Sequence, residues 1–165
     1  MREIPDPGFA GDDGQADPEV RRALASYGTD PERLHNPTLA VLQSARLLVP
    51  VVAVLGEVEH DDAGLAHDKT SDMATVLITG RDGRTALLAF TSSEAMRRWD
   101  PQARPVPVPA SKAAEAAVQD RASAIVVDVA GPEMFVVEED DLRALAEGYT
   151  LVEVSGGYGW ARPAR

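Results

Sequence analysis

The amino-acid sequence predicts a single α/β (or α+β) domain with a mixed β-sheet flanked by short helices. Continuous runs of β-branched and aliphatic residues, typical of strands buried on both faces, recur along the chain. Segments with apolar residues at helical spacing alternate with these runs, as in α/β and α+β domains. Two pairs of neighbouring strands are separated only by short turns, so the sheet must contain antiparallel pairs. With 165 residues and 44% apolar content, the chain is long enough for one core.

The two ends of the chain differ in composition from the middle. Residues 1–16 contain several prolines and glycines and few apolar side chains, so we expect a flexible N-terminal arm. The folded domain is expected at residues 17–154. Residues 155–165 begin with a glycine-rich stretch and are expected to form a partly ordered C-terminal tail.

Helices are predicted where capping residues precede apolar residues at helical spacing. In chain order the predicted helices begin at Asp17, Asn36, Thr91, Ser111 and Glu138. The segment Thr91–Glu94 matches a capping box, in which the Thr91 hydroxyl accepts from the amide of Glu94 while the Glu94 carboxylate accepts from the amide of Thr91. This helix is expected to run to about Trp99.

Strands are predicted from the apolar runs between these helices. In chain order the runs are Leu47–Leu55, Met73–Thr79, Thr85–Phe90, Ala124–Val129, Met134–Val137 and Thr150–Val154. Asp82-Gly83 between two of the runs indicates a β-hairpin. The stretch Asp100–Pro109 is rich in proline, which lacks an N–H donor, so we expect an edge strand or an extended connector there.

The charge balance and the lack of cysteine exclude several classes of function. The chain has 27 acidic and 16 basic residues and a formal charge of −11, so we expect no nucleic-acid partner. The acidic clusters serve either solubility or the docking of a basic partner. Without cysteine, thiolate catalysis and Cys-based metal sites are impossible. The longest apolar run is too short to cross a membrane and the first residues lack a signal-peptide pattern, so we expect a cytoplasmic protein without membrane contact.

No pattern typical of catalysis or metal binding is present in the sequence. Two histidines and three aspartates occur within residues 60–68, but their spacing is not a known metal-ligand pattern. A G-x-S-x-G motif is absent, and Ser92, Ser93 and Ser111 lie where helix caps are expected. We therefore expect no enzyme activity, no metal and no cofactor.

Several short motifs follow one another in a characteristic order. They are Leu47–Pro50, Asp68–Met73, Gly83-Arg84 before Ala89–Thr91, Ala95–Trp99, Arg104–Val108 and Val127–Pro132. In this order they resemble the N-terminal domain of the SseB-like proteins, in their actinobacterial branch, over about residues 37–148. The resemblance implies a single small domain with a mixed sheet and flanking helices. It implies no demonstrated biochemical activity and supplies no catalytic residues.

The function expected from these observations is that of a non-enzymatic interaction or regulatory module that binds a protein partner. An aromatic and proline-bearing surface for that partner would consist of Phe90, Trp99, Arg104 and the prolines that follow Arg104. Alternatively, Phe90 and Trp99 bracket a short helix and pin it to the sheet.

A small-ligand-binding sensor or enzyme is the alternative function. Lys69, Ser71 and Asp72 directly precede a buried strand, where an ammonium group and a hydroxyl suit a carboxylate or a phosphate. The same residues also suit a structural turn in which Lys69 pairs with a neighbouring carboxylate. The sequence leaves both interpretations open.

Overall fold

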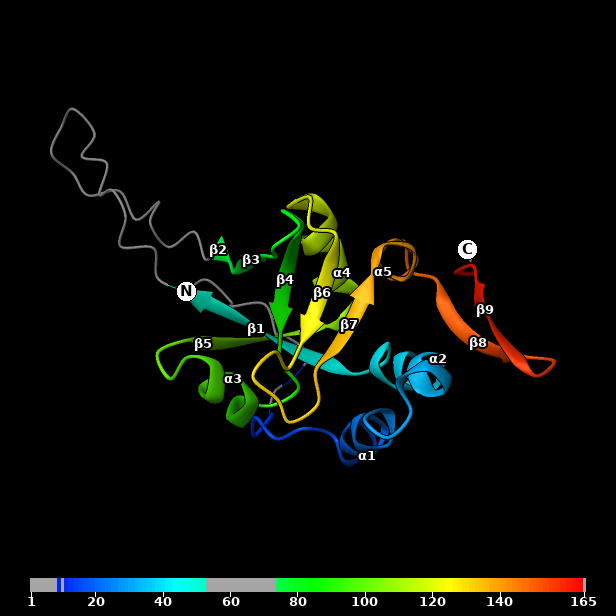
Figure 1. The fold of residues 1–165 in the computed structure, drawn as a ribbon, viewed down its shortest axis with the longest axis horizontal. Coiled ribbons are helices and arrows are strands. Elements are labelled where there is room, and N and C mark those ends of the chain that lie inside the picture. The colour runs from blue at the N-terminus through cyan, green and yellow to red at the C-terminus, as the bar shows by residue number, and fades with distance from the viewer. Residues whose placement is uncertain (1–8, 10, 53–73, 165) are drawn as a thin grey trace, which may run out of the picture.

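The computed structural model describes residue 9, residues 11–52 and residues 74–164 (Figure 1). Its helices are α1 (Pro18–Tyr27), α2 (Pro31–Leu42), α3 (Ser93–Trp99), α4 (Ala110–Gln119) and α5 (Glu139–Ala146). Its strands are β1 (Arg46–Val52), β2 (Ala74–Thr75), β3 (Leu77–Thr79), β4 (Thr85–Ala89), β5 (Arg104–Pro109), β6 (Ala124–Val127), β7 (Phe135–Glu138), β8 (Thr150–Val154) and β9 (Gly157–Ala161). The predicted mixed α/β fold is confirmed.

The central sheet has four strands in the order β3-β4-β6-β7. The strand β4 runs parallel to β6, with Leu87 opposite Ile125, whereas the outer pairs are antiparallel. A parallel pair needs a crossover connection, which here passes through α3, β5 and α4. Consequently β4 and β6 end at the same edge of the sheet, next to α3 (Figure 1).

A second sheet, β2-β1-β5, crosses the lower end of the central sheet. The two sheets are joined where Leu48 and Phe90 exchange backbone hydrogen bonds of 2.7 and 2.8 Å. The proline-rich segment forms the edge strand β5, which confirms the first of the two conformations predicted for it. Every second residue of β5 is a proline, at positions 105, 107 and 109, and the residues between them can donate to β1. The prolines therefore occupy the positions at which a backbone N–H would point away from β1, so the lack of this group costs no hydrogen bond.

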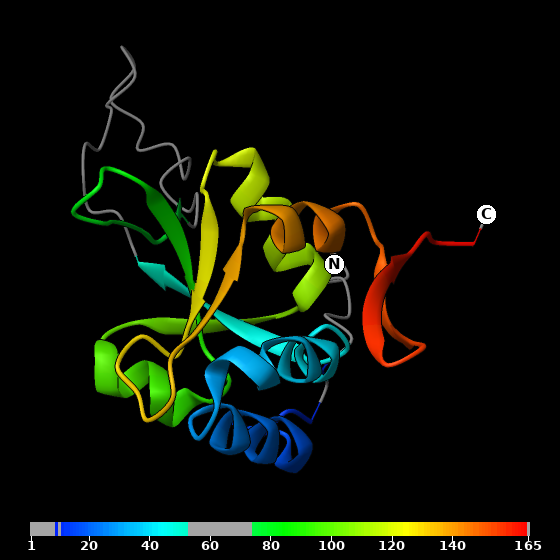
Figure 2. The same ribbon diagram turned by 45° about the vertical axis from the view of Figure 1, so that its right-hand side comes forward.

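The two faces of the central sheet build two separate apolar clusters. Leu87 and Ala89 of β4 point into the larger cluster, which α1, α2, α4 and α5 cover, and Leu88 and Phe90 point into the smaller one beneath α3. This alternation follows from the period of two along a strand. Figure 2 shows α4 and α5 on one side of the sheet, with α1 and α2 below it.

The helix starts differ from the prediction at α2, α3 and α4. The helix α4 begins at Ala110 with Pro109 as its N-cap, so Ser111 lies inside the helix and is not its cap. The helix α2 begins six residues earlier than predicted, at Pro31, with Asp30 as its N-cap, and Pro37 lies inside the helix. Both Asp30-Pro31 and Asn36-Pro37 carry the cap-plus-proline signal, so the local pattern does not distinguish them. At α3 the N-cap is Ser92, whose hydroxyl accepts from the amide of Ala95, rather than Thr91.

No helix among the described residues is long and apolar enough to span a membrane.

The segments at the two ends make specific contacts. In the predicted N-terminal arm, Gly14 accepts a hydrogen bond of 2.8 Å from the amide of Ser93, and a Cβ at Gly14 would collide with the Ser93 side chain. In the predicted C-terminal tail, residues 157–161 form β9, which pairs with β8 through a turn at Ser155-Gly156. Both turn residues have positive φ, of 40° and 83°, which suits a tight hairpin.

Candidate functional site

A cleft of about 460 Å³ lies where β4 and β6 end, between α1, α3 and the loop that follows β6. Its lining residues are Ala16, Arg21, Leu24, Ala25, Thr91, Ser92, Glu94, Ala95, Arg98, Asp128, Pro132 and Glu133. Ligands of open α/β sheets bind in crevices outside the carboxyl ends of the strands, and this cleft has that position. It is therefore the best-placed candidate site among the described residues.

The floor of the cleft is a buried pair of side chains from the ends of β4 and β6. The Asp128 side chain accepts one hydrogen bond of 2.8 Å from the Thr91 amide and another of 2.6 Å from the Thr91 hydroxyl. Asp128 is 3% exposed and Thr91 is 6% exposed. Since both carboxyl oxygens of Asp128 are engaged by Thr91, the pair ties the ends of the two parallel strands together.

Asp128 has a carboxyl with a shifted pKa and a backbone in the left-handed conformation. Burial raises the pKa of its carboxyl above the ordinary value for aspartate, against the opposing effect of the two hydrogen bonds from Thr91. Its φ is 55°, a left-handed conformation that aspartate tolerates better than most residues. This conformation turns the chain at the end of β6 into the loop that forms one wall of the cleft.

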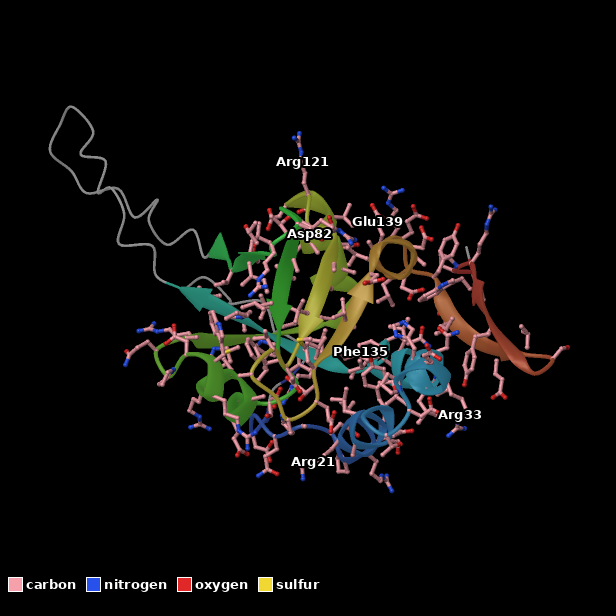
Figure 3. The ribbon with its side chains drawn as sticks, viewed as in Figure 1. Arg21, Arg33, Asp82, Arg121, Phe135 and Glu139 are labelled. Carbon is pink, nitrogen blue, oxygen red and sulfur yellow. The ribbon has the colours of Figure 1, made fainter. Side chains whose placement is uncertain are left out.

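The walls of the cleft carry charges of both signs. On α3, Arg98 lies 3.3 Å from the carboxylate of Glu94, one helical turn away. Arg21 belongs to α1, at the end of that helix nearest α3 (Figure 3). Glu133 belongs to the loop after β6. Glu94 thus pairs with Arg98 and not, as the capping box predicted, with the amide of Thr91.

The two hydroxyl groups at the floor of the cleft both have hydrogen-bond partners. The Thr91 hydroxyl is buried and bonded to Asp128, and the Ser92 hydroxyl caps α3, so each has a structural partner. Within the described part of the chain, no three acidic or histidine side chains are close enough together to hold a metal ion. The accessible polar groups of the cleft are the charged side chains on its walls.

A family model described as the SseB protein N-terminal domain matches residues 20–144. The chain belongs to this family. The matched range covers about three quarters of the 165 residues and contains every lining residue of the cleft except Ala16. The hairpin β8–β9 of this SseB domain lies outside the matched range. No curated protein and no solved structure matches the sequence.

The predicted aromatic surface of this SseB domain is mostly interior. The Phe90 side chain is 0% exposed, and its ring centroid lies 5.7 Å from that of the half-buried Trp99. Arg104 is exposed on the edge strand β5. Phe90 and Trp99 therefore pack α3 against the sheet, as the alternative interpretation of these aromatics stated, and none of the three residues lines the cleft.

The other predicted site, Lys69, Ser71 and Asp72, lies outside the described residues. Conversely, Asp128 was not predicted as a site residue, although a sequence signal was present. Asp128 is a charged residue inside the apolar run Ala124–Val129, and a charge at such a position needs buried partners.

A second contact network fixes the N-terminal segment of this SseB domain beside the cleft. The Arg46 guanidinium donates to the Asp12 carboxylate and to the backbone carbonyls of Gln15 and Thr91. Both charged side chains are largely buried, at 12% and 17% exposure. The hydrogen bond from Arg46 lowers the pKa of Asp12, with a further lowering by the amide of Gly14 and an opposing effect of burial.

We expect the stability that Asp12 contributes to disappear at low pH. Because the pKa of Asp12 is lower in the folded than in the unfolded chain, its contribution is complete above pH 3.8, the unfolded value, and is lost as the pH falls through the folded value. Urea unfolding of the wild type and of Asp12→Asn should differ by about 1.5–3 kcal/mol near neutral pH, and the difference should shrink in acid. A difference that stays constant down to about pH 2.5 would contradict the ion pair.

Proposed function

We propose that this SseB N-terminal domain is a non-enzymatic interaction or regulatory module that binds a segment of a partner protein in the cleft between α1 and α3. The observation that carries the proposal is the arrangement of the cleft itself. Its buried polar floor is satisfied internally by Asp128 and Thr91, whereas its walls present charged groups to solvent. Such a site offers recognition without a reactive group.

The composition of the walls supports a peptide as the ligand. Ala25 of α1 and Pro132 of the loop after β6 supply exposed apolar area, beside small exposed parts of the buried Leu24 and Ala95. Arg21 and Arg98 supply cations beside the acidic Glu94 and Glu133. Apolar area rimmed by charges of both signs is typical of protein interfaces. The volume of about 460 Å³ is also within the range of ligand pockets, about 300–1,000 Å³, and accommodates only a short segment.

Three further expectations belong to this proposal. The assignment to the actinobacterial branch of the family rests on the order of the short motifs. A cytoplasmic location remains the expectation stated from the sequence. The absence of nucleic-acid partners rests on the formal charge of −11, which repels phosphate backbones.

The cleft can be blocked with little risk to the fold. Ala25 is exposed on α1 and lines the cleft, whereas its neighbour Ser26 is also exposed and does not line it. We expect Ala25→Trp to fill the cleft and to reduce partner recovery by at least about tenfold, the effect of losing about 1.4 kcal/mol of binding free energy. Ser26→Trp is the matched control and should bind like the wild type.

Partner recovery is measured by affinity capture from the cells that naturally produce the chain. The wild type, Ala25→Trp and Ser26→Trp each serve as bait, and the retained proteins are quantified by mass spectrometry. A set of proteins retained by the wild type and by Ser26→Trp, but lost with Ala25→Trp, supports the proposal. If every retained protein is insensitive to Ala25→Trp, the cleft is not the docking site. If instead a metabolite mixture raises the melting temperature of the wild type and not of Ala25→Trp, the cleft binds a small ligand.

A further inference from the structure

Among the described residues, the β8–β9 hairpin has one strand edge that is covered and one that is free. On the β8 side, the Gln43 amide donates to the Leu151 carbonyl at 2.8 Å and accepts from the Leu151 amide at 2.7 Å. Gln43 thereby takes the place of a neighbouring strand. On the other side, β9 has no strand partner except β8 in the described part of the chain. Figure 2 shows β9 at the outer end of the molecule.

The free edge of β9 lacks the features that normally prevent strand pairing. Edge strands are usually protected by charged side chains, by proline or by a bulge. The edge strand β5 follows this rule with three prolines. The sequence of β9, Gly-Tyr-Gly-Trp-Ala, has neither charge nor proline, and its pairing with β8 is regular from Val154↔Gly157 to Thr150↔Ala161. This edge is therefore open to another strand.

The turn geometry identifies the free backbone groups of β9. Both residues of the Ser155-Gly156 turn have positive φ, as in a two-residue type I′ hairpin. In such a hairpin the pair next to the turn, Val154 and Gly157, exchanges backbone hydrogen bonds. From there, non-hydrogen-bonded and hydrogen-bonded pairs alternate along the two strands. The N–H and C=O groups of Tyr158 and Trp160 consequently point away from β8.

We infer that β9 pairs with β9 of a second copy of this chain, antiparallel and centred on Gly159. In this register Tyr158 of one copy faces Trp160 of the other. In each copy, Tyr158 and Trp160 carry the backbone N–H and C=O groups that are not bonded to β8. The pairing makes two cross-strand aromatic contacts and brings no charges face to face. A second copy supplies this complementarity by symmetry, because a two-fold axis presents the same strand to itself.

The interface is distant in sequence and in role from the cleft. It uses a hairpin beyond the segment that matches the SseB family, and it requires no residue of α1 or α3. Because only one strand edge is buried, we expect weak association, with a dissociation constant on the order of micromolar.

A charge at Gly159 tests the inference directly. A Cβ at Gly159 would meet only the Val154 side chain, at 3.6 Å, and the φ of Gly159 is not in the left-handed region, so a side chain fits the monomer. In the dimer, residue 159 lies opposite itself. We expect Gly159→Glu and Gly159→Lys each to abolish dimerisation, because like charges face one another directly. An equimolar mixture of the two variants should dimerise again.

Sedimentation velocity of the full chain from about 1 to 200 µM measures the association. Val154→Glu and Val154→Lys are matched controls on the exposed face of β8 and should leave the dimer intact. Their counterparts are separated by three strand spacings, roughly 14 Å, and in addition by a displacement along the strands, because Val154 lies opposite Thr150 of the second copy. A monomeric wild type at every concentration overturns the inference. So does a dimer that survives both Gly159 variants, and so does a mixture of the two variants that fails to dimerise.

Discussion

Replacing Phe90 by alanine is expected to lower the free energy of unfolding by about 3–5 kcal/mol. The Phe90 side chain is fully buried and packs with Leu48, Leu88 and Met96 in the cluster beneath α3. Its removal leaves a cavity and also ends the contact with the Trp99 ring, whose plane is tilted by 32° from that of Phe90. The backbone of Phe90 joins the two sheets, so the cavity opens at their junction.

Urea unfolding of the full chain measures this effect, with two controls. Arg104→Ala removes an exposed side chain on β5 and should change the free energy of unfolding by less than about 0.5 kcal/mol. Phe90→Leu keeps most of the volume and should lose less stability than Phe90→Ala. If Phe90→Ala costs less than about 1 kcal/mol, the ring is not part of a packed core and its predicted role in partner binding becomes the better explanation.

Replacing Asp128 by alanine is expected to cost about 2–5 kcal/mol, because the buried N–H and hydroxyl of Thr91 both lose their partner. The substitution also leaves a φ of 55° to a residue that tolerates it less well than aspartate does. Asp128→Asn retains an amide oxygen that accepts from the Thr91 amide, so it should lose clearly less stability. Equal losses in the two variants would contradict the hydrogen-bond explanation.

The pH dependence of the same variants separates the charge of Asp128 from its hydrogen bonds. Burial raises the pKa of the Asp128 carboxyl in the folded chain, so the folded state binds this proton more tightly than the unfolded state does. The contribution of Asp128 to stability is therefore greatest below the unfolded pKa of 3.8 and decreases as the pH rises through the raised folded pKa. Asp128→Asn cannot titrate and should lack this decrease.

A change at Asp128 is also expected to affect the cleft. The Asp128–Thr91 pair forms its floor, and the loop after β6 that carries Glu133 begins at this residue. In the capture experiment, a folded Asp128→Asn protein should therefore bind the partner more weakly than Ser26→Trp does, although it removes no group from the walls. Unchanged recovery would show that recognition depends on the walls alone.

Most of the secondary structure followed from the local sequence. The Asp82-Gly83 turn between two apolar runs predicted the β3–β4 hairpin, and the apolar run that begins at Ala124 predicted β6. These features depend on backbone preferences of a few adjacent residues and on the period of apolar positions, so they are readable without knowledge of distant contacts. The predicted start of α2 was wrong because two equivalent capping signals occur six residues apart.

The candidate site depended on contacts that the local sequence does not specify. Asp128 reaches Thr91 across 37 positions, and Gln43 completes the edge of β8 across 108 positions. Their side chains meet only because the parallel pairing of β4 with β6 brings two strand ends together and because α2 packs beside β8. The sequence by itself determined most of the helices and strands, since those choices are local. It did not predict β9, which lies in the expected C-terminal tail, or the division of the run Met73–Thr79 between β2 and β3 of different sheets. Only the tertiary structure decided which polar side chains share a cleft, since that depends on strand order and on the direction of the crossover.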